Sequence, residues 1–265
     1  MFEDLPRLVG ALPPGTLPPG RMVEPEDGGP PRYWLSDAAT DPDVWVRMRS
    51  RHRESGLWPL LLSGLSREES RPWADGEVYP AGMSSPDQHD AADLLARWWE
   101  DCTDTDEDDL LSSTDRAAVT APFRQTWPGI ALPADSTGPA AHFADRYAEF
   151  LLRTPARLGL VPAVRGADAL AVTGWSGPAN HTNDTGEIAA VVRSWEERFG
   201  ARVVGVGFDT LHLSVAAPPA APGHALRVAA EHFAFCPDNV WQGAGTLTAY
   251  AEQLVGMNSW SFWWD

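Results

Sequence analysis

The sequence predicts an α+β protein in which helices pack on a mixed β-sheet. Two apolar, β-branched runs, 203–208 and 211–215, have the composition of neighbouring strands joined by a tight turn, and the double proline at 218–219 ends the second run. Residues 185–199, in contrast, repeat apolar side chains at helical spacing, so a helix precedes this hairpin. In the C-terminal part the predicted order is β-α-β-β-α-α-β, which favours helices packed on one mixed sheet.

Composition divides the chain into three parts. Residues 1–31 form a Pro/Gly-rich arm, because eight prolines between positions 6 and 31 favour an extended or looped segment over a helix. Residues 32–135 are predicted to form an N-terminal α+β region, an extension of the C-terminal α+β domain at 136–265. A soft boundary between them is expected near 130–138.

The N-terminal region begins with a predicted strand at 33–35. A helix follows, since Asp41 can cap it, Pro42 fits its first turn and Gly56 can end it. The next strand is expected at 57–65. A second helix is expected to open at Ser85 and to bury one side, because its apolar residues up to Cys102 follow helical spacing.

The C-terminal elements are predicted from the same signals. One helix is expected to begin at Asp184 or Thr185, as its cap, and to end at Gly200, which is typical of a helix stop. The other elements expected are a helix at 139–152, extended segments at 158–164 and 168–173, helices at 222–235 and 246–255, and a strand at 260–264.

Charge and composition exclude several classes of protein. The formal net charge is −17, so phosphate backbones and anionic membranes are repelled, and neither nucleic acid nor a membrane is an expected partner. All 20 basic residues are arginines, which rules out a Schiff-base lysine and a phosphate-loop lysine. The two cysteines lie far apart and no apolar run is long enough to span a bilayer, so we expect reduced thiols and a cytoplasmic protein.

Four arginines follow one another at alternate positions in the first predicted helix. At about 100° per residue, Arg47 and Arg51 point to nearly the opposite side from Arg49 and Arg53. We therefore interpret them as solvated arginines with local ion pairs. An anion site is the alternative.

An acidic run offers a weak metal hypothesis. Asp104, Asp106, Asp108 and Asp115 occupy positions 1, 3, 5 and 12 of a frame similar to a calcium loop. However, position 6 is Asp109 where that loop needs glycine, and position 12 is an aspartate instead of a bidentate glutamate. A solvated acidic loop is the favoured interpretation, and no metal and no cofactor are expected.

The end of the chain resembles a known family. Phe235-Cys236-Pro237-Asp238, Gln242-Gly243 and the terminal Phe262-Trp263-Trp264-Asp265 together resemble the bacterial family called domain of unknown function 4253, over roughly residues 158–265. The residues before them resemble the N-terminal extension of its longer members. Members often carry a further cysteine where this chain has the cysteine-free stretch 173–180, so a two-cysteine site is not expected here.

The best catalytic constellation lies next to this motif. His232 and Cys236 are four residues apart at the end of a predicted helix, with Glu231 and Asp238 as orienting carboxylates. The neighbouring residues are apolar, however, and apolar surroundings raise a thiol pKa and hide the sulfur. A structural cysteine is therefore favoured over a nucleophile.

The motif also supplies a candidate surface for a ligand or a partner. In a terminal strand Trp263 faces the side opposite to Phe262 and Trp264, and Asp265 carries both its side chain and the terminal carboxylate. The residues assigned to this surface are Trp175, Gln242, Trp263 and Asp265.

These observations favour a non-enzymatic protein-interaction module. One version is an immunity or antidote protein that attracts a basic protein partner electrostatically. The alternatives are an enzyme of unrecognised class around His232, Cys236 and Asp238, and a regulator that binds calcium or a small ligand in the acidic loop. The sequence leaves the oligomeric state open.

Overall fold

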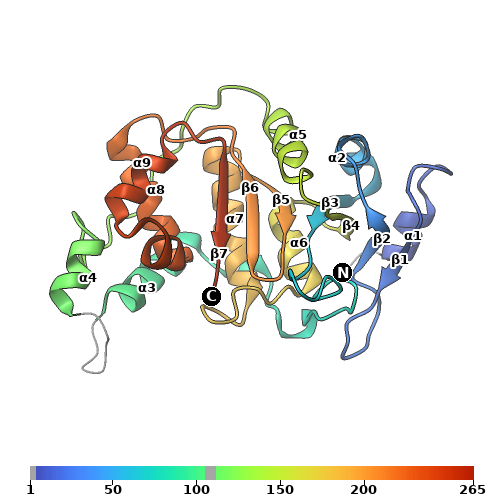
Figure 1. Ribbon diagram of the computed structural model, residues 1–265, viewed down its shortest axis with the longest axis horizontal. Helices are drawn as coiled ribbons and strands as arrows, with labels where there is room; N and C mark the ends of the chain where they lie inside the picture. The colour runs from blue at the N-terminus through green and yellow to red at the C-terminus, as the bar shows by residue number, and fades with distance from the viewer. Residues whose placement is uncertain (1–3, 105–111) are drawn as a thin grey trace.

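The computed structural model of the chain describes residues 4–104 and 112–265 and contains a seven-stranded mixed sheet. The strands are β1 (Gly20–Val23), β2 (Tyr33–Ala39), β3 (Leu57–Leu62), β4 (Arg157–Pro162), β5 (Arg202–Val206), β6 (Thr210–Ser214) and β7 (Ser259–Trp263). They lie in the order β1-β2-β4-β3-β5-β6-β7, which Figure 1 shows from right to left. β3 and β5 are parallel, and the other neighbouring strands are antiparallel.

Helices cover both faces of this sheet, so the predicted α+β class is confirmed. The helices are α1 (Leu5–Gly10), α2 (Pro42–Ser55), α3 (Ala91–Thr103), α4 (Ser113–Val119), α5 (Ala140–Leu151), α6 (Gly166–Thr173), α7 (Thr185–Phe199), α8 (Pro222–Phe235) and α9 (Leu247–Leu254). Short 3₁₀ turns lie at Pro80–Gly82 and Pro86–Gln88, and a π-helical turn lies at Asn239–Ala244. Among the described residues no helix is long and apolar enough to cross a bilayer.

β3 lies in the middle of the sheet and separates two hydrophobic cores. All six of its residues are buried. Leu57 and Leu61 join the core under α2 and α5, whereas Trp58, Leu60 and Leu62 join the larger core under α3, α6, α7, α8 and α9. Because both faces of the strand are covered, its sequence is a continuous apolar run without alternation.

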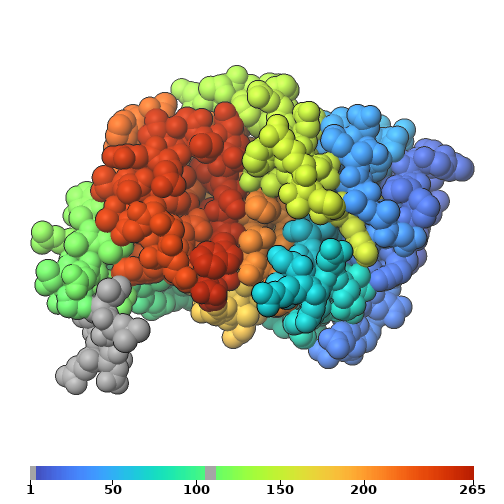
Figure 2. Space-filling model, in the orientation of Figure 1, coloured from blue at the N-terminus to red at the C-terminus, as the bar shows by residue number. Residues whose placement is uncertain are grey.

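β3 also joins the two parts of the chain. It pairs with β4 on one side, where Leu60 lies opposite Gly159, and with β5 on the other, where Leu61 lies opposite Gly205. A strand from the first quarter of the sequence therefore lies between two strands from the C-terminal part. Figure 2 shows a similar interlocking at the surface, where the yellow-green α5 segment contacts both the blue N-terminal and the orange-red C-terminal segments.

Most of the predicted helix ends are confirmed. The side chain of Asp41 accepts a hydrogen bond from the Val44 backbone N–H at 3.0 Å, and Gly56 ends α2 with a φ of 69°. Asp184 caps α7 in the same way, and Gly200 ends it with a φ of 60°. Left-handed backbone of this kind favours glycine, which explains why the glycine signals located both ends.

The prediction that residues 168–173 are extended is wrong, because this segment belongs to α6. Ala167, Ala169, Leu170 and Ala171 are all buried, so the helix shows no apolar stripe that would distinguish it from a buried strand. Alanine and leucine are strong helix formers, however, and Gly174 supplies the stop. The predicted C-terminal order is confirmed, with α6 and α7 together in the place of one helix.

Two further predictions need correction near the N-terminus. The proline-rich arm was expected to lack a helix, yet α1 begins there, since Pro6 occupies one of its first positions and costs no internal hydrogen bond. The arm also supplies the edge strand β1. The helix expected from Ser85 begins only at α3, because Asp90 accepts hydrogen bonds from the Ala92 and Asp93 backbone N–H groups and caps it there.

The segment 130–138, where the boundary is expected, contacts a buried ion pair. Glu231 is fully buried, and its carboxylate accepts hydrogen bonds from both terminal nitrogens of Arg198, at 2.7 and 2.6 Å. Glu231 also accepts from the Ala131 backbone N–H, and Arg198 donates to the Ala131 carbonyl. The connection between the two predicted regions is thus fastened to the C-terminal helices.

Candidate functional site

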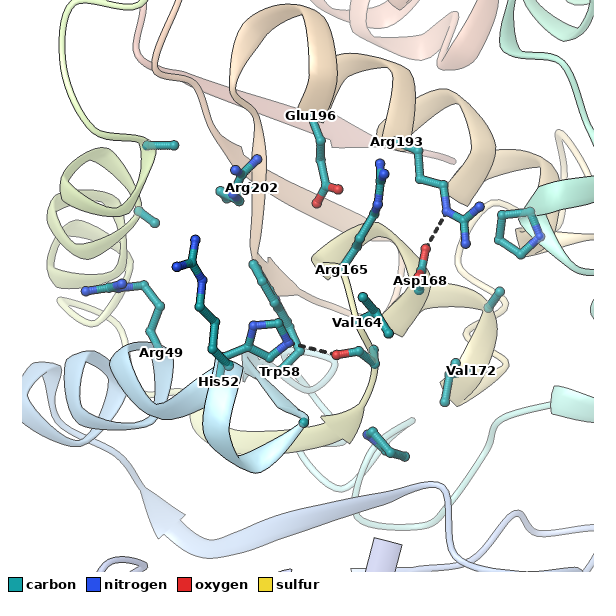
Figure 3. A pocket seen from close by; sticks show the side chains of 18 of the residues that line it. Arg49, His52, Trp58, Val164, Arg165, Asp168, Val172, Arg193, Glu196 and Arg202 are labelled. Carbon is teal, nitrogen blue, oxygen red and sulfur yellow. Dashed lines mark hydrogen bonds and ion pairs between the residues drawn. The ribbon is translucent and has the colours of Figure 1, made fainter. Parts of the chain in front are cut away.

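A groove of about 1650 Å³ lies between α2, the start of α5, α6 and α7. It is built from both parts of the chain, and Figure 3 shows side chains from these elements directed into the same space. The charged and titratable side chains that line it are Arg49, His52, Arg53, Asp87, Arg165, Asp168, Arg193, Glu196, Glu197 and Arg202.

Trp58 forms part of the groove and ties it to the sheet. Its indole N–H donates to the Val203 carbonyl at 3.1 Å, and His52 stands edge-on to the ring at 4.8 Å between centroids. His52 in turn donates from Nε2 to the Ala163 carbonyl at 2.8 Å. A Cβ at Gly166 would lie 2.6 Å from the Trp58 ring, so a glycine is needed where α6 starts against the indole.

Two of the arginines are held by carboxylates. Arg49 donates to Asp145 through two nitrogens, with Nη2–Oδ2 at 2.8 Å, and this fork fixes the guanidinium against α5. Arg165 donates to Glu197 at 2.7 Å, and both of these side chains are more than two-fifths exposed. The first pair is therefore the better ordered of the two, since exposed pairs are screened by water.

Arg193 bridges two carboxylates at the far end of the groove. Its Nε lies 2.5 Å from Asp168 Oδ1, as Figure 3 shows, and its Nη1 donates to Asp87. The Arg193 guanidinium lowers the pKa of the Asp87 carboxyl below its usual value. Arg193 is thus occupied on both sides by groups of the protein itself.

Arg53 and Arg202 differ from these three arginines. Within the described residues neither makes an ion pair with a carboxylate, and Arg202 donates to the carbonyl of its neighbour Ala201 at 2.6 Å. Arg53 is exposed at the end of α2, and Arg202 is half-buried at the start of β5. They are the guanidinium groups of the groove that remain available to an external anion.

Glu196 lies on α7 between the arginines. Its Oε1 accepts a hydrogen bond from the Ala167 backbone N–H at 3.2 Å, near the start of α6. Burial raises the pKa of the Glu196 carboxyl to about 7, against the opposing attraction of Arg202. This carboxyl therefore changes its charge near neutral pH inside the groove.

The groove differs in charge from the chain as a whole. Five arginines and four carboxylates line it, whereas the full sequence has 20 basic and 37 acidic side chains. The first turn of α5 has no side-chain cap and its residues line the groove, which adds positive partial charge, whereas Glu196 accepts from a first-turn N–H of α6. The groove is thus locally basic in an acidic protein.

The sequence analysis interpreted the arginines of α2 as solvated, and in the structure two of them form one wall of this groove. Arg49 and Arg53 line it and Arg47 and Arg51 do not, as the predicted separation of the two pairs implies. The sequence analysis missed the opposite wall, which is formed mainly by Arg165, Arg193, Glu196 and Arg202. No local sequence pattern indicated these residues, because they lie more than a hundred positions from α2 along the chain. They approach α2 only through the order of the strands in the sheet.

The structure places His232 and Cys236 away from solvent. Both side chains are fully buried, and burial raises the thiol pKa of Cys236 to about 12 and lowers the pKa of His232 well below its usual value. Cys236 Sγ donates to the Trp263 carbonyl at 3.0 Å, and His232 Nδ1 lies 3.1 Å from the Tyr250 hydroxyl. The two side chains thus have separate partners.

The two proposed orienting carboxylates are likewise engaged elsewhere. Glu231 belongs to the buried pair with Arg198. Asp238 accepts hydrogen bonds from the Asp265 backbone N–H at 3.2 Å and from Gln242 Nε2 at 3.0 Å. A catalytic role for these residues stays a prediction.

Of the four residues assigned to a partner surface, three lie near the chain end. Gln242 and Asp265 are exposed and share the carboxylate of Asp238, and Trp263 is half-buried beside them. Trp175 is instead buried, and its indole N–H donates to the carbonyls of residues 207 and 208. A surface role for these residues also stays a prediction.

The acidic loop lies largely outside the described residues, which include neither Asp106 nor Asp108. Asp104 follows α3, and Asp115 lies in the first turn of α4, where its backbone N–H donates to Ser112 Oγ. Within 4–104 and 112–265, no three histidine, cysteine or acidic side chains are grouped so that they could hold a metal ion.

Comparison with known proteins identifies the C-terminal part of the chain. Residues 157–265 match the model of a family described as a domain of unknown function, DUF4253. No curated protein and no solved structure matches the chain. The matched segment contains β4 to β7 and the α6 and α7 walls of the groove, while α2, β3 and α5 precede it. Residues 157–265 are therefore similar to the domain of unknown function 4253 family, and residues 1–156 lie outside the match.

Proposed function

We propose that this protein is a non-enzymatic binding module and that a partner protein docks in the groove between α2, α5, α6 and α7. The observation that carries the proposal is the convergence of five arginines on one open groove in a chain of net charge −17. A cluster of positive charges on a protein with a negative net charge favours recognition of a specific partner over non-specific electrostatic attraction.

The size of the groove supports a macromolecular partner. Small-molecule pockets have volumes of about 300–1,000 Å³, and this groove is larger, at about 1650 Å³. Apolar side chains lie beside its charges, among them Val164, which is 82% exposed. A mixture of charged groups and an exposed apolar anchor is typical of protein interfaces.

The burial of the cysteine and histidine supports binding over catalysis. A nucleophilic cysteine needs a lowered pKa and access to substrate. Cys236 has a raised pKa and no exposed surface. Catalysis there would need an opening of the C-terminal core, whereas binding in the groove needs no such change.

The test is a comparison of partners captured by groove and surface variants. Tagged wild-type protein, Val164→Trp and Leu132→Trp are each used to capture partners from the native cell lysate, followed by mass spectrometry. Val164 lines the groove, whereas Leu132 is 76% exposed and lies outside it, so the two variants add the same bulk in different places. Both variants should unfold at the same temperature as the wild type.

We expect a stoichiometric protein that Val164→Trp loses and Leu132→Trp retains. Retention by both variants, or loss from both, would show that the groove does not carry the interaction. Capture of no protein by the wild type would count against a binding module.

A second candidate, a basic partner, is favoured by the charge outside the groove. Among the described residues, four carboxylates and five arginines line the groove, so the acidic excess of the chain lies outside it. A basic partner bound there should dissociate as the ionic strength rises, because salt screens exposed charges over about 10 Å at 0.1 M. Its capture should be insensitive to Val164→Trp.

A further inference from the structure

We propose that Arg53 and Arg202 bind the carboxylates of an acidic peptide segment that lies in the groove. This inference rests on the proposed function and names the chemistry of the docked segment. The two arginines come from α2 and from the start of β5, on different walls of the same groove.

The ion pairs of the groove divide its arginines into two groups. Arg49, Arg165 and Arg193 already bind carboxylates of the protein. Arg53 and Arg202 have no such pair within the described part of the chain, although four acidic residues line the groove. A guanidinium without a carboxylate partner is ready for a charge-assisted hydrogen bond, which is stronger than a neutral one.

Charge complementarity selects carboxylates over basic groups as the occupant. Arg53 and Arg202 present their positive charge at the groove wall, and the start of α5, which has no side-chain cap, adds to it. A nucleic acid is disfavoured, because four carboxylates also line the groove and the whole chain is strongly acidic. Spaced carboxylates on a peptide can instead reach two separate arginines and leave Val164 for an apolar contact.

The test uses labelled peptides and the full chain. Fluorescein-labelled hexaglutamate and hexaglutamine are titrated with protein at low ionic strength, and binding is followed by fluorescence anisotropy. The net charge of −17 repels an acidic peptide, so any binding of hexaglutamate must come from a local basic site. Unlabelled inorganic phosphate is added as a competitor to distinguish a peptide site from a small-anion site.

Matched variants locate the site. Arg53→Gln and Arg202→Gln each remove one charge from the groove, and Arg51→Gln removes the same charge from the same helix as Arg53 but outside the groove. Thermal unfolding confirms that each variant is folded. Arg202→Lys keeps the charge of Arg202 and loses its forked geometry.

We expect hexaglutamate to bind the wild type, hexaglutamine not to bind, and each groove variant to weaken binding about tenfold or more. Arg51→Gln should change binding less than about twofold, since its charge is screened. No binding of hexaglutamate, or an equal loss in Arg51→Gln, would overturn the inference. Full competition by millimolar phosphate would overturn the inference of a peptide ligand and would indicate that the groove binds a small anion.

The lysate comparison with Val164→Trp uses no charge variant, so it tests the proposed function separately.

Discussion

The thiol of Cys236 donates a hydrogen bond to the backbone carbonyl of Trp263, with the two heavy atoms 3.0 Å apart. Trp263 lies in β7, the last strand of the sheet, and Asn239 donates to the carbonyl of Ser261 in the same strand at 2.8 Å. Side chains that follow α8 therefore bind carbonyls of β7, which has no further strand beside it in the part of the chain that the structure describes. Unpaired edges promote association between chains, and these contacts cover one.

The same contacts give a structural account of the family motif in this chain. Asp238 accepts from the backbone of Asp265 and from the side chain of Gln242. The three motif segments, at 235–238, 242–243 and 262–265, thus contact one another and fasten the end of the chain. These contacts give a structural reason for the motif to contain both a cysteine and an aromatic strand, and this reason involves no catalytic step.

The first prediction concerns the reactivity of the two thiols. With Cys236 buried and its pKa raised to about 12, almost none of it is thiolate at pH 8, and burial raises the pKa of Cys102 to a similar value. We expect neither cysteine to react with 5,5′-dithiobis(2-nitrobenzoic acid) in the folded protein. Both should react at once in denaturant. The variants Cys102→Ser and Cys236→Ser assign any signal, and rapid reaction of native Cys236 would restore the enzyme hypothesis.

The second prediction concerns the C-terminal part of the chain on its own. Because β3 lies between β4 and β5, a fragment of residues 136–265 has a gap in its sheet and exposes apolar side chains from both cores. We expect this fragment to lack a cooperative thermal transition and to lack dispersed amide signals in its NMR spectrum.

Addition of residues 1–135 as a separate chain is the matched control for that fragment. The added chain supplies β3 and α2, so cooperative unfolding should return if the missing strand is the cause. A fragment 136–265 that unfolds cooperatively by itself would show that the C-terminal part closes its sheet in another way.

The third prediction concerns the buried pair of Glu231 and Arg198. Glu231→Gln keeps the shape of the side chain but leaves the Arg198 guanidinium buried without a countercharge, which costs about 3–5 kcal/mol of unfolding free energy. Urea denaturation measures this loss. The control is Glu197→Gln, which breaks the exposed pair with Arg165 and should cost less than about 1 kcal/mol. Equal losses of unfolding free energy in the two variants would show that burial does not make the Glu231–Arg198 pair more important for stability than an exposed pair.

Local signals in the sequence were sufficient for most of the fold. The capping side chains Asp41 and Asp184 and the glycines Gly56 and Gly200 located both ends of two helices, because each signal acts within one turn. They were insufficient for α6, where burial on all sides removes the periodicity that separates a helix from a strand. The position of β3 between β4 and β5 was also out of reach, since pairing between distant strands leaves no local pattern.

The candidate site was predictable only on one wall. Helical geometry separated Arg49 and Arg53 from Arg47 and Arg51, and this separation matches the groove. Arg202 and Glu196 lie more than 140 positions further along the chain, and they reach the same groove through the parallel pairing of β3 with β5. Sequence reasoning also placed its best chemistry at Cys236 and His232, because a spacing of four residues gives a shared helix face but says nothing about burial.

The fourth prediction is a pH dependence set by Glu196. Its folded-state pKa of about 7 lies above the usual value of 4.5, so between these values the folded chain holds a proton that the unfolded chain has released. The stabilisation by this proton is complete below about pH 4.5 and is lost as the pH rises to about 7. Glu196→Gln removes the titration, since glutamine stays neutral. Relative to the wild type, this variant should therefore gain up to about 3 kcal/mol of unfolding free energy between pH 4.5 and 8.

Urea denaturation of wild type and Glu196→Gln at a series of pH values measures this difference, and other titrating groups cancel because both proteins share them. Glu197→Gln is the control, since Glu197 is 65% exposed on the same helix and its loss should cost less than about 1 kcal/mol at every pH. A difference for Glu196→Gln that is constant from pH 4.5 to 8 would mean that water solvates the carboxylate in the groove. The groove would then hold a fixed negative charge beside Arg202 at every pH, and hexaglutamate binding would depend on pH in the same way in the wild type and in Glu196→Gln. With the raised pKa, in contrast, binding should strengthen more in the wild type than in Glu196→Gln as the pH falls from 8 to 6, because protonation of Glu196 removes a repelling charge.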